Sequence, residues 1–325
     1  MLIGESIALV VAVSWTATAL FAEVASKHLG SLPFNVMRMT LSLALLTLTL
    51  WVTMGVPWPR YADAATWRWL LLSGVVGYVI GDYCLMQGYI IIGSRFGQLL
   101  MTLSAPTAAI TGRLLLGESM RPLAIVGMVV TLTGIAISIL GKGSPESHAV
   151  SLRLPVKGIV YGAMAGICQG VGLVLSKVGL QHYDAALQVL NISDHSVPEG
   201  ALLPMPLFLS IPYASTMIRA SIGLVGFFIM LMVLNKDGLS RLRNGLKDRK
   251  AMWCVVGSTV FGPFIGVSLS LLATQYTSTG IAQTLFALTP VLIIAPAAWL
   301  FHQRVRPREV LGAVISVAGA ALFFV

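Results

Sequence analysis

One carboxylate and several polar residues lie inside long apolar stretches of the sequence, where they could act on a solute. Asp82 follows an apolar segment, and Tyr83 and Gln87 come soon after it. A charge at membrane depth is costly, so such a residue usually faces a water-filled cavity or an ionic partner. Asp82 could therefore bind a substrate amine or a proton. The alternatives are a structural ion pair with an arginine such as Arg113, or an interfacial position.

Two arginines, Arg38 and Arg219, lie near the starts of apolar segments and correspond to each other in an internal repeat. Long basic side chains in such places usually extend to the lipid headgroups, and we expect that here. If both face inward instead, they would suit an anionic or carboxylate-bearing substrate. Glu23 and Lys27 are four residues apart, in the favourable order for an ion pair on one helix, and we interpret them as structural.

A second set of candidates carries no charge. Amides can bind a solute without the cost of a buried charge, but they also join helices by hydrogen bonds, which we favour slightly. Gln98 and Gln283 are the stronger candidates because they correspond in the repeat, and the site of a duplicated transporter lies near its symmetry axis. Trp15 could line a cavity, although packing is more common. The candidate substrate-binding residues are Trp15, Arg38, Asp82, Tyr83, Gln87, Gln98, Gln169, Arg219, Tyr276 and Gln283.

Patterns typical of catalysis or metal binding are missing from the sequence. It contains no HExxH, Walker loop or GxSxG motif. Gly81-Asp82 resembles part of an intramembrane aspartyl protease motif, but Val79 stands where that motif needs glycine. The three cysteines lie in apolar stretches without CxxC spacing, as expected for buried thiols. We therefore expect no enzyme, no metal site and no cofactor.

The composition is that of a membrane protein. Hydrophobic residues make up 57% of the chain and charged residues only 10%, whereas soluble domains carry about 25% charged residues. No Asp, Glu, Lys or Arg occurs from Ala251 to Gln303, a run long enough for two membrane spans. The net charge of +9 is assigned to cytoplasmic loops and not to nucleic-acid binding.

Hydropathy predicts ten membrane-spanning segments. They must be helices, because lipid leaves every backbone amide to be paired within its own segment. The alternating ten-residue segments of a barrel are absent from the sequence. The predicted spans are 5–26, 33–54, 69–91, 95–116, 120–140, 157–180, 212–234, 251–273, 278–301 and 307–325.

The chain contains an internal repeat of five predicted helices. Near the front a shift of 150 places Ser26-Lys27 on Ser176-Lys177, and a shift of 181 then places Arg38 on Arg219. The jump locates an insertion at about 182–211. We divide the chain into a first repeat (1–141), a linker (142–156) and a second repeat (157–325). A shift of 185 aligns Gly77, Gly81, Gln98, Pro122, Gly127 and Gly134 with Gly262, Gly266, Gln283, Pro307, Gly312 and Gly319.

An odd number of helices per repeat predicts that the second copy enters the membrane from the opposite side. Inverted repeats of this kind recur in secondary transporters, although duplication also occurs in channels. Most Lys and Arg residues outside the spans fall in connectors after odd-numbered helices. The positive-inside rule then places both termini outside.

Short motifs in both copies make the chain similar to a known family. The first copy carries Ile80-Gly81-Asp82-Tyr83, Gly93-Ser94-Arg95, Ser104-Ala105-Pro106 and Leu116-Gly117-Glu118, and the second Leu288-Thr289-Pro290, Val310-Leu311-Gly312-Ala313 and Ala318-Gly319. With these motifs the sequence resembles the EamA-type module of the drug/metabolite transporter superfamily, which implies ten helices, inverted pseudo-symmetry and export or exchange of small metabolites such as amino acids.

Two departures from the family pattern bear on mechanism. The Gly-Glu pair of the first copy is His302-Gln303 in the second, so that carboxylate is not duplicated. Four-helix multidrug members of the superfamily carry a coupling glutamate eight residues before a lysine. The corresponding residues here are Ala19 and Gln169, so proton antiport of that type is disfavoured.

We conclude from the sequence that the chain is a secondary or facilitative transporter that works by alternating access. The alternatives are a non-transport membrane subunit and a membrane-embedded enzyme. The expected partners are a small-molecule substrate and the lipid bilayer, without nucleic acid or an ATPase subunit, and a homodimer stays open. The resemblance favours the inner (plasma) membrane of a bacterium.

Overall fold

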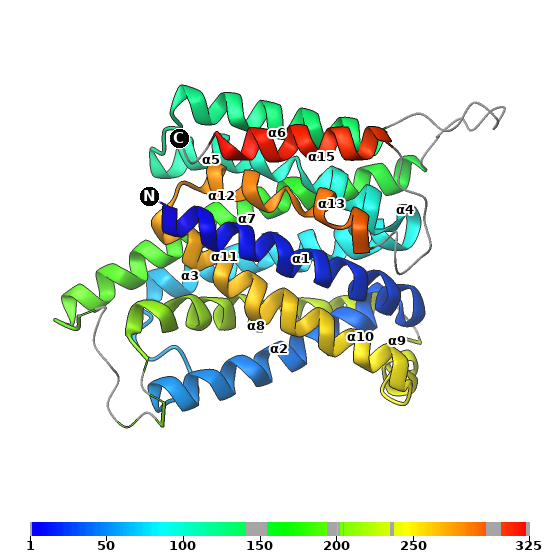
Figure 1. Ribbon diagram of the computed structural model, residues 1–325. Coiled ribbons are helices and arrows are strands. Elements are labelled where there is room, and N and C mark those ends of the chain that lie inside the picture. Colours follow the sequence, from blue (N-terminus) through cyan, green and yellow to red (C-terminus); the bar gives the residue numbers. More distant parts are fainter. Residues whose placement is uncertain are drawn as a thin grey trace.

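The computed structural model describes residues 2–140, 155–193, 200, 202–203, 205–234, 237–296 and 307–322, and these ranges contain helices and no β-strand (Figure 1). The α-helices are α1 (Leu2–Leu29), α2 (Ser31–Met54), α3 (Ala64–Gly74), α4 (Tyr83–Met101), α5 (Ser104–Leu116), α6 (Pro122–Leu140), α7 (Val156–Val189), α8 (Leu207–Leu234), α9 (Gly238–Gly245), α10 (Arg249–Thr259), α11 (Val267–Tyr276), α12 (Thr279–Phe286), α13 (Thr289–Leu292) and α15 (Pro307–Ala321). Two π-helical segments, η1 (Val75–Asp82) and η2 (Val260–Gly266), connect α3 to α4 and α10 to α11.

The helices form an integral multi-pass membrane protein. Seven helical stretches are long and apolar enough to cross a bilayer, and α6 and α15 contain shorter apolar stretches. Large apolar side chains cover the outside of the bundle, as lipid contact requires, and they include Val10, Leu48, Val129, Phe228, Ile229 and Val314. The all-helical architecture is thus confirmed, whereas the number of ten crossings stays a prediction.

The predicted span 157–180 ends too early, whereas the insertion at about 182–211 stays a prediction. The helix expected to end at 180 continues as α7 to Val189. Tyr183 and Leu187 are each only 1% exposed, and burying their apolar side chains favours further helical turns. Helix α8 then begins at Leu207. Residues 194–199 of the insertion, 142–154 of the predicted linker and His302-Gln303 lie outside the described residues.

The repeat seen in the sequence is also a repeat of local structure. Asp63 caps the start of α3 and accepts a hydrogen bond from the Thr66 amide, which holds the pKa of Asp63 below its usual value. Asp248, 185 residues later, caps α10 in the same way. The π-helical segments η1 and η2 begin 185 residues apart, at Val75 and Val260. In each copy, therefore, an equivalent N-terminal cap starts a helix that continues into an equivalent π-helical segment.

The helical stretch that follows each π-helical segment is interrupted. Gly93 has a φ of +80° inside α4, so the helix restarts at Ser94, between the predicted spans 69–91 and 95–116. The chain breaks again at Thr102, between α4 and α5, just before Pro106, whose ring removes a backbone donor. The second copy has the same break between α12 and α13, just before Pro290.

Equivalent helices of the two copies pack against each other in opposite directions. Helix α6 lies along α15, and α2 along α8. Thr131 donates to the Ser316 carbonyl at 3.4 Å, and Ser316 donates to the Thr131 carbonyl at 3.3 Å. Such reciprocal contacts between residues 185 apart are those of a local two-fold axis. In Figure 1, α6 and α15 run antiparallel, and α1 begins at the end of the bundle where α15 ends.

Close backbone approach at this axis gives a first prediction. A Cβ on Gly134 would lie 2.5 Å from the Ser316 amide nitrogen, and one on Gly319 would lie 2.5 Å from that of Thr131. We expect Gly134→Ala and Gly319→Ala to destabilise the protein by about 1–3 kcal/mol, which outweighs the roughly 0.5–1 kcal/mol that alanine gains in a helix.

Thermal unfolding in detergent measures both effects. Gly88→Ala is the matched control, because the nearest atom to a Cβ there is 3.8 Å away. Equal melting temperatures for all three variants and the parent would contradict the proposed packing of α6 on α15.

Candidate functional site

The helices of both copies surround a small central cavity of about 50 Å³. Helix α1 packs on η2 and α7 packs on η1, so each copy supplies walls to the other. Polar and charged side chains reach this space from α1, α2, η1, α4 and α7. The lining residues are Trp15, Thr18, Arg38, Tyr78, Asp82, Leu85, Met86, Tyr89, Gln98, Met101, Gln169, Gly262, Pro263 and Val267.

Asp82 and Arg38 form a buried ion pair on the wall of the cavity. The Arg38 guanidinium donates to Asp82 Oδ2, and Gln169 Nε2 approaches Asp82 Oδ1 at 3.4 Å. Asp82 is 4% exposed and Arg38 3%. The alternative partner suggested by the sequence, Arg113, is exposed at the end of α5. The pair therefore joins α2 to η1 beside the cavity.

Arg219 lies in the same polar region but has a different neighbour. Its guanidinium carbon is 5.0 Å from the centre of the Tyr78 ring, a cation–π contact. Arg219 is 3% exposed. The prediction that Arg38 and Arg219 extend to the headgroups is therefore wrong for both. The distance from a helix start gives the position of a residue along the helix, but not the face of the helix from which its side chain projects.

The two symmetric glutamines have different roles. Gln98 lines the cavity and donates to the Tyr89 hydroxyl at 2.5 Å. Gln283 accepts from Ser104 Oγ at 3.1 Å and donates to the Gln169 carbonyl at 3.4 Å. Gln283 thus bridges α12 to α5 and α7, the role that the sequence slightly favoured for such amides.

Five of the ten predicted site residues meet at the cavity, namely Trp15, Arg38, Asp82, Gln98 and Gln169. Tyr83 faces Tyr161 edge-on with 6.2 Å between ring centres, and Gln87 donates to Ser31. Tyr276 is exposed. Neither Tyr83, Gln87 nor Tyr276 is among the residues that line the cavity.

Sequence reasoning missed several residues of the cavity wall, Tyr89 above all. A signal for it exists in the spacing of Tyr78, Asp82, Leu85 and Tyr89. These residues recur every three or four positions and so mark one helical face. All four line the cavity. Tyr89 could therefore have been predicted from its position on the same helical face as Asp82.

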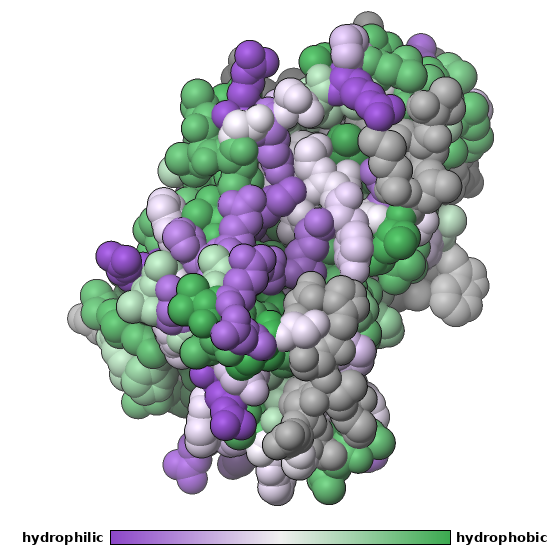
Figure 2. Space-filling model, turned by 90° about the vertical axis from the view of Figure 1, so that its left-hand side faces the viewer, coloured by the Kyte–Doolittle hydropathy of each residue, from purple (hydrophilic) through white to green (hydrophobic). Residues whose placement is uncertain are grey.

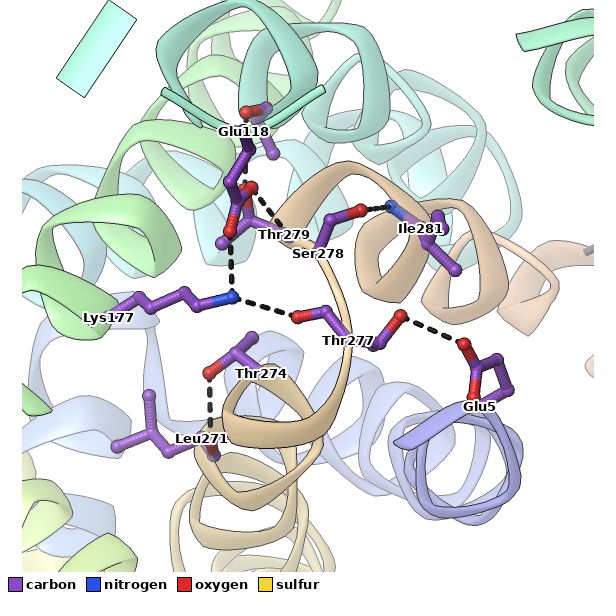
Figure 3. Close-up of polar contacts among 10 residues, drawn as sticks. Glu5, Glu118, Lys177, Leu271, Thr274, Thr277, Ser278, Thr279 and Ile281 are labelled. Carbon is purple, nitrogen blue, oxygen red and sulfur yellow. Dashed lines mark hydrogen bonds and ion pairs between the residues drawn. The ribbon is translucent and has the colours of Figure 1, made fainter. Parts of the chain in front are cut away.

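A second polar site joins four elements near the start of α1 (Figure 3). Lys177 on α7 contacts Glu118 Oε1 at 2.7 Å and the Thr277 carbonyl at 2.9 Å. Glu118 also accepts from the Thr279 amide at 2.9 Å and from its hydroxyl at 2.6 Å. Thr277 in turn donates to Glu5 on α1 at 2.9 Å. We call these five residues the outer cluster.

Gly117 allows the chain to turn at the end of α5, and this turn positions Glu118 in the outer cluster. Its φ of +64° ends α5 and turns the chain, a conformation that glycine adopts without strain. The amide of Glu118 then bonds the Gly112 carbonyl at 3.3 Å. This turn places the Glu118 carboxylate against the turn between α11 and α12.

A related cluster, the inner cluster, lies at the other end of α1. Glu23 contacts Lys27 at 2.5 Å and accepts from the Ser94 amide at 3.0 Å, so the predicted ion pair is confirmed. Lys27 and Ser94 are the repeat equivalents of Lys177 and Thr279. The carboxylates are not equivalent, because Glu23 shares a helix with its lysine whereas Glu118 comes from another element.

The cavity lies between the two clusters. Trp15 and Thr18 face it from the middle of α1, and Glu5 and Glu23 flank them, about 27 Å apart at 1.5 Å per residue. Figure 2 views the end of the bundle where α1 begins, and hydrophilic residues gather down its middle between hydrophobic flanks. The arrangement is a buried polar site with a polar cluster toward each end of the bundle.

The buried pair gives a second prediction. Removing one charge leaves the other uncompensated, so Arg38→Gln or Asp82→Asn alone is expected to cost about 3–5 kcal/mol of stability. The double variant is expected to cost less than the sum of the two changes, because both charges are then gone. Melting temperatures of the four proteins in detergent measure this coupling. Additive losses would show that the two side chains act independently.

The comparisons with known proteins agree with this architecture. A solved structure described as "Crystal structure of protein" aligns with 97% of this chain and 96% of its own length, with a TM-score of 0.61 and 14% identity, a likeness of fold alone. No curated protein matches the sequence. The EamA-like transporter family matches residues 2–140 and 210–325, one stretch for each repeat. The chain therefore belongs to the EamA-like transporter family.

Proposed function

We propose that this protein is a secondary or facilitative carrier of small metabolites such as amino acids, which it exports or exchanges by alternating access. The observation that carries the proposal is a buried, charged cavity at the junction of two inverted repeats, with a polar cluster toward each end. Carriers built from inverted repeats bind their substrates at such a junction. We place the protein in a bacterial inner membrane with both termini outside.

The cavity supports this proposal by its chemistry. Ionisable groups at membrane depth usually mark a substrate or ion pathway. Arg38, Asp82, Gln98 and Gln169 offer charged and amide groups to one small volume, and Trp15 adds an aromatic wall. A few convergent polar groups in a largely apolar pocket are typical of small-molecule sites. In this proposal these residues bind the substrate.

The two clusters support alternating access. In the outer cluster, Glu118 belongs to the first repeat, whereas Lys177 and Thr279 belong to the second. Separation of the repeats at this end must break those bonds, so we assign the outer cluster as a gate. Glu23, Lys27 and Ser94 all belong to the first repeat. The inner cluster therefore does not oppose separation of the repeats at its end.

The third prediction concerns transport itself. In proteoliposomes loaded with an amino-acid and metabolite panel, we expect saturable counterflow of at least one solute. Asp82→Asn should reduce it about tenfold or more, because the variant leaves Arg38 without its counterion in the site. Asp63→Asn is the matched control, since asparagine also caps a helix and residue 63 is outside the cavity. Normal counterflow by Asp82→Asn at every pH tested would remove Asp82 from the site.

The fourth prediction concerns the gate. Thr18→Cys in a background with alanine at positions 84, 168 and 254 places a thiol on the cavity wall. Glu118→Gln removes the carboxylate, so the ion pair with Lys177 is lost and the hydrogen bonds from Thr279 become weaker neutral ones. We expect it to speed labelling by a membrane-impermeant thiol reagent about 3–10-fold from the side of the termini, which corresponds to about 1 kcal/mol.

Glu23→Gln is the matched control for this experiment, because it weakens the cluster at the other end of α1. It should leave labelling from the side of the termini unchanged. Equal labelling rates in the parent and Glu118→Gln proteins would contradict a gate at Glu118.

A further inference from the structure

The charged groups of the central site do not balance. Arg38 is neutralised by Asp82. Arg219 has no carboxylate within 4.0 Å and no hydrogen-bonded partner among the described residues, and its Nε is buried without an acceptor. The face of the Tyr78 ring is the contact that its guanidinium makes. Two buried guanidinium groups thus share one carboxylate.

The repeat identifies where the second carboxylate is missing. Arg38 and Arg219 are equivalent, and so are Asp82 and residue 267, which is valine. Val267 lines the cavity. Helices α8 and α11 meet there, since Ser268 donates to Thr216 at 3.1 Å. The second repeat therefore keeps the arginine and replaces its counterion by an apolar wall of the cavity.

The Arg219 guanidinium lies beside the cavity. The nearest atoms to a Cβ on Gly77 would be Arg219 Nη2 at 3.0 Å and Gln169 Oε1 at 3.9 Å. Gln169 and Tyr78, its two neighbours here, both line the cavity. A side chain at position 77 would crowd the guanidinium. Arg219 is not itself among the lining residues, and its guanidinium lies next to Tyr78, which is one of them.

We propose that Arg219 binds the carboxylate of the transported substrate, which supplies the counterion that Val267 lacks. A buried charge without a partner is costly, and guanidinium binds carboxylate through paired hydrogen bonds. The site has one uncompensated positive charge, which a single carboxylate balances and a doubly charged phosphate would exceed. The substrate class is small monocarboxylates, α-amino acids included. This inference rests on the proposed carrier function.

Two substitutions at one position test the inference. Val267→Asp supplies an internal carboxylate that competes with the substrate for Arg219, whereas Val267→Asn has nearly the same size without the charge. The probes are α-amino acids and short monocarboxylic acids, each paired with its own amide. Shifts in melting temperature in detergent measure binding, and counterflow in proteoliposomes measures transport.

We expect the parent protein and Val267→Asn to bind acids at least about tenfold more tightly than the matching amides. Val267→Asp and Arg219→Gln should lose this preference. Because the introduced carboxylate would pair with Arg219, the Val267→Asp protein should melt no lower than Val267→Asn. This comparison separates competition from misfolding.

The results that would overturn this inference differ from those that would overturn the proposed carrier function. Equal binding of acids and amides, or acid binding by Val267→Asp equal to that by Val267→Asn, would remove Arg219 from substrate recognition while leaving transport in place. An acid-specific, Arg219-dependent shift in melting temperature without any counterflow would support the carboxylate site and overturn the carrier. Neither binding nor counterflow for any acid would overturn both.

Discussion

The ion pair between Arg38 and Asp82 joins α2 to η1 inside the bundle, where both side chains are almost fully buried. Charges in this environment must find partners inside the protein, and each partner fixes the position of a helix. Gln169 extends the pair to α7, in the second repeat. Arg219 stacks on Tyr78 of the first repeat. Polar contacts that cross between the copies therefore lie at the wall of the cavity.

The duplication supplies the frame in which these charges lie. Reciprocal bonds between Thr131 and Ser316 place a local two-fold axis between α6 and α15. The residues of the proposed site and gate include positions at which the two copies differ. Asp82 corresponds to Val267, so Arg219 lacks the carboxylate that its equivalent Arg38 has. Glu118 bonds across the repeats. Residues that are equivalent in the two copies thus form the bundle. Residues that differ between the copies make its two ends, and the surroundings of its two arginines, unlike.

Hydropathy predicted the helical architecture and the depth of Asp82, and the four-residue spacing predicted the ion pair of Glu23 with Lys27, because each depends on residues near in sequence. The face that Arg38 presents could not be predicted, since it depends on the crossing of α2 with η1. The outer cluster was missed because α1, α5, α7 and the turn after α11 contribute to it. The end of α7 was misplaced because charged Asp184 interrupts the apolar run, although Tyr183 beside it is buried.

In alternating access the cavity opens toward one end of the bundle at a time. Electron paramagnetic resonance distances between spin labels test it directly. One pair on Leu123 and Val189 reports on the end near the outer cluster, and one on His28 and Leu234 reports on the other end; all four side chains are exposed. In proteoliposomes, a transported solute should shift the two distance distributions in opposite directions. Distributions that stay fixed, or that widen together, would contradict alternating access.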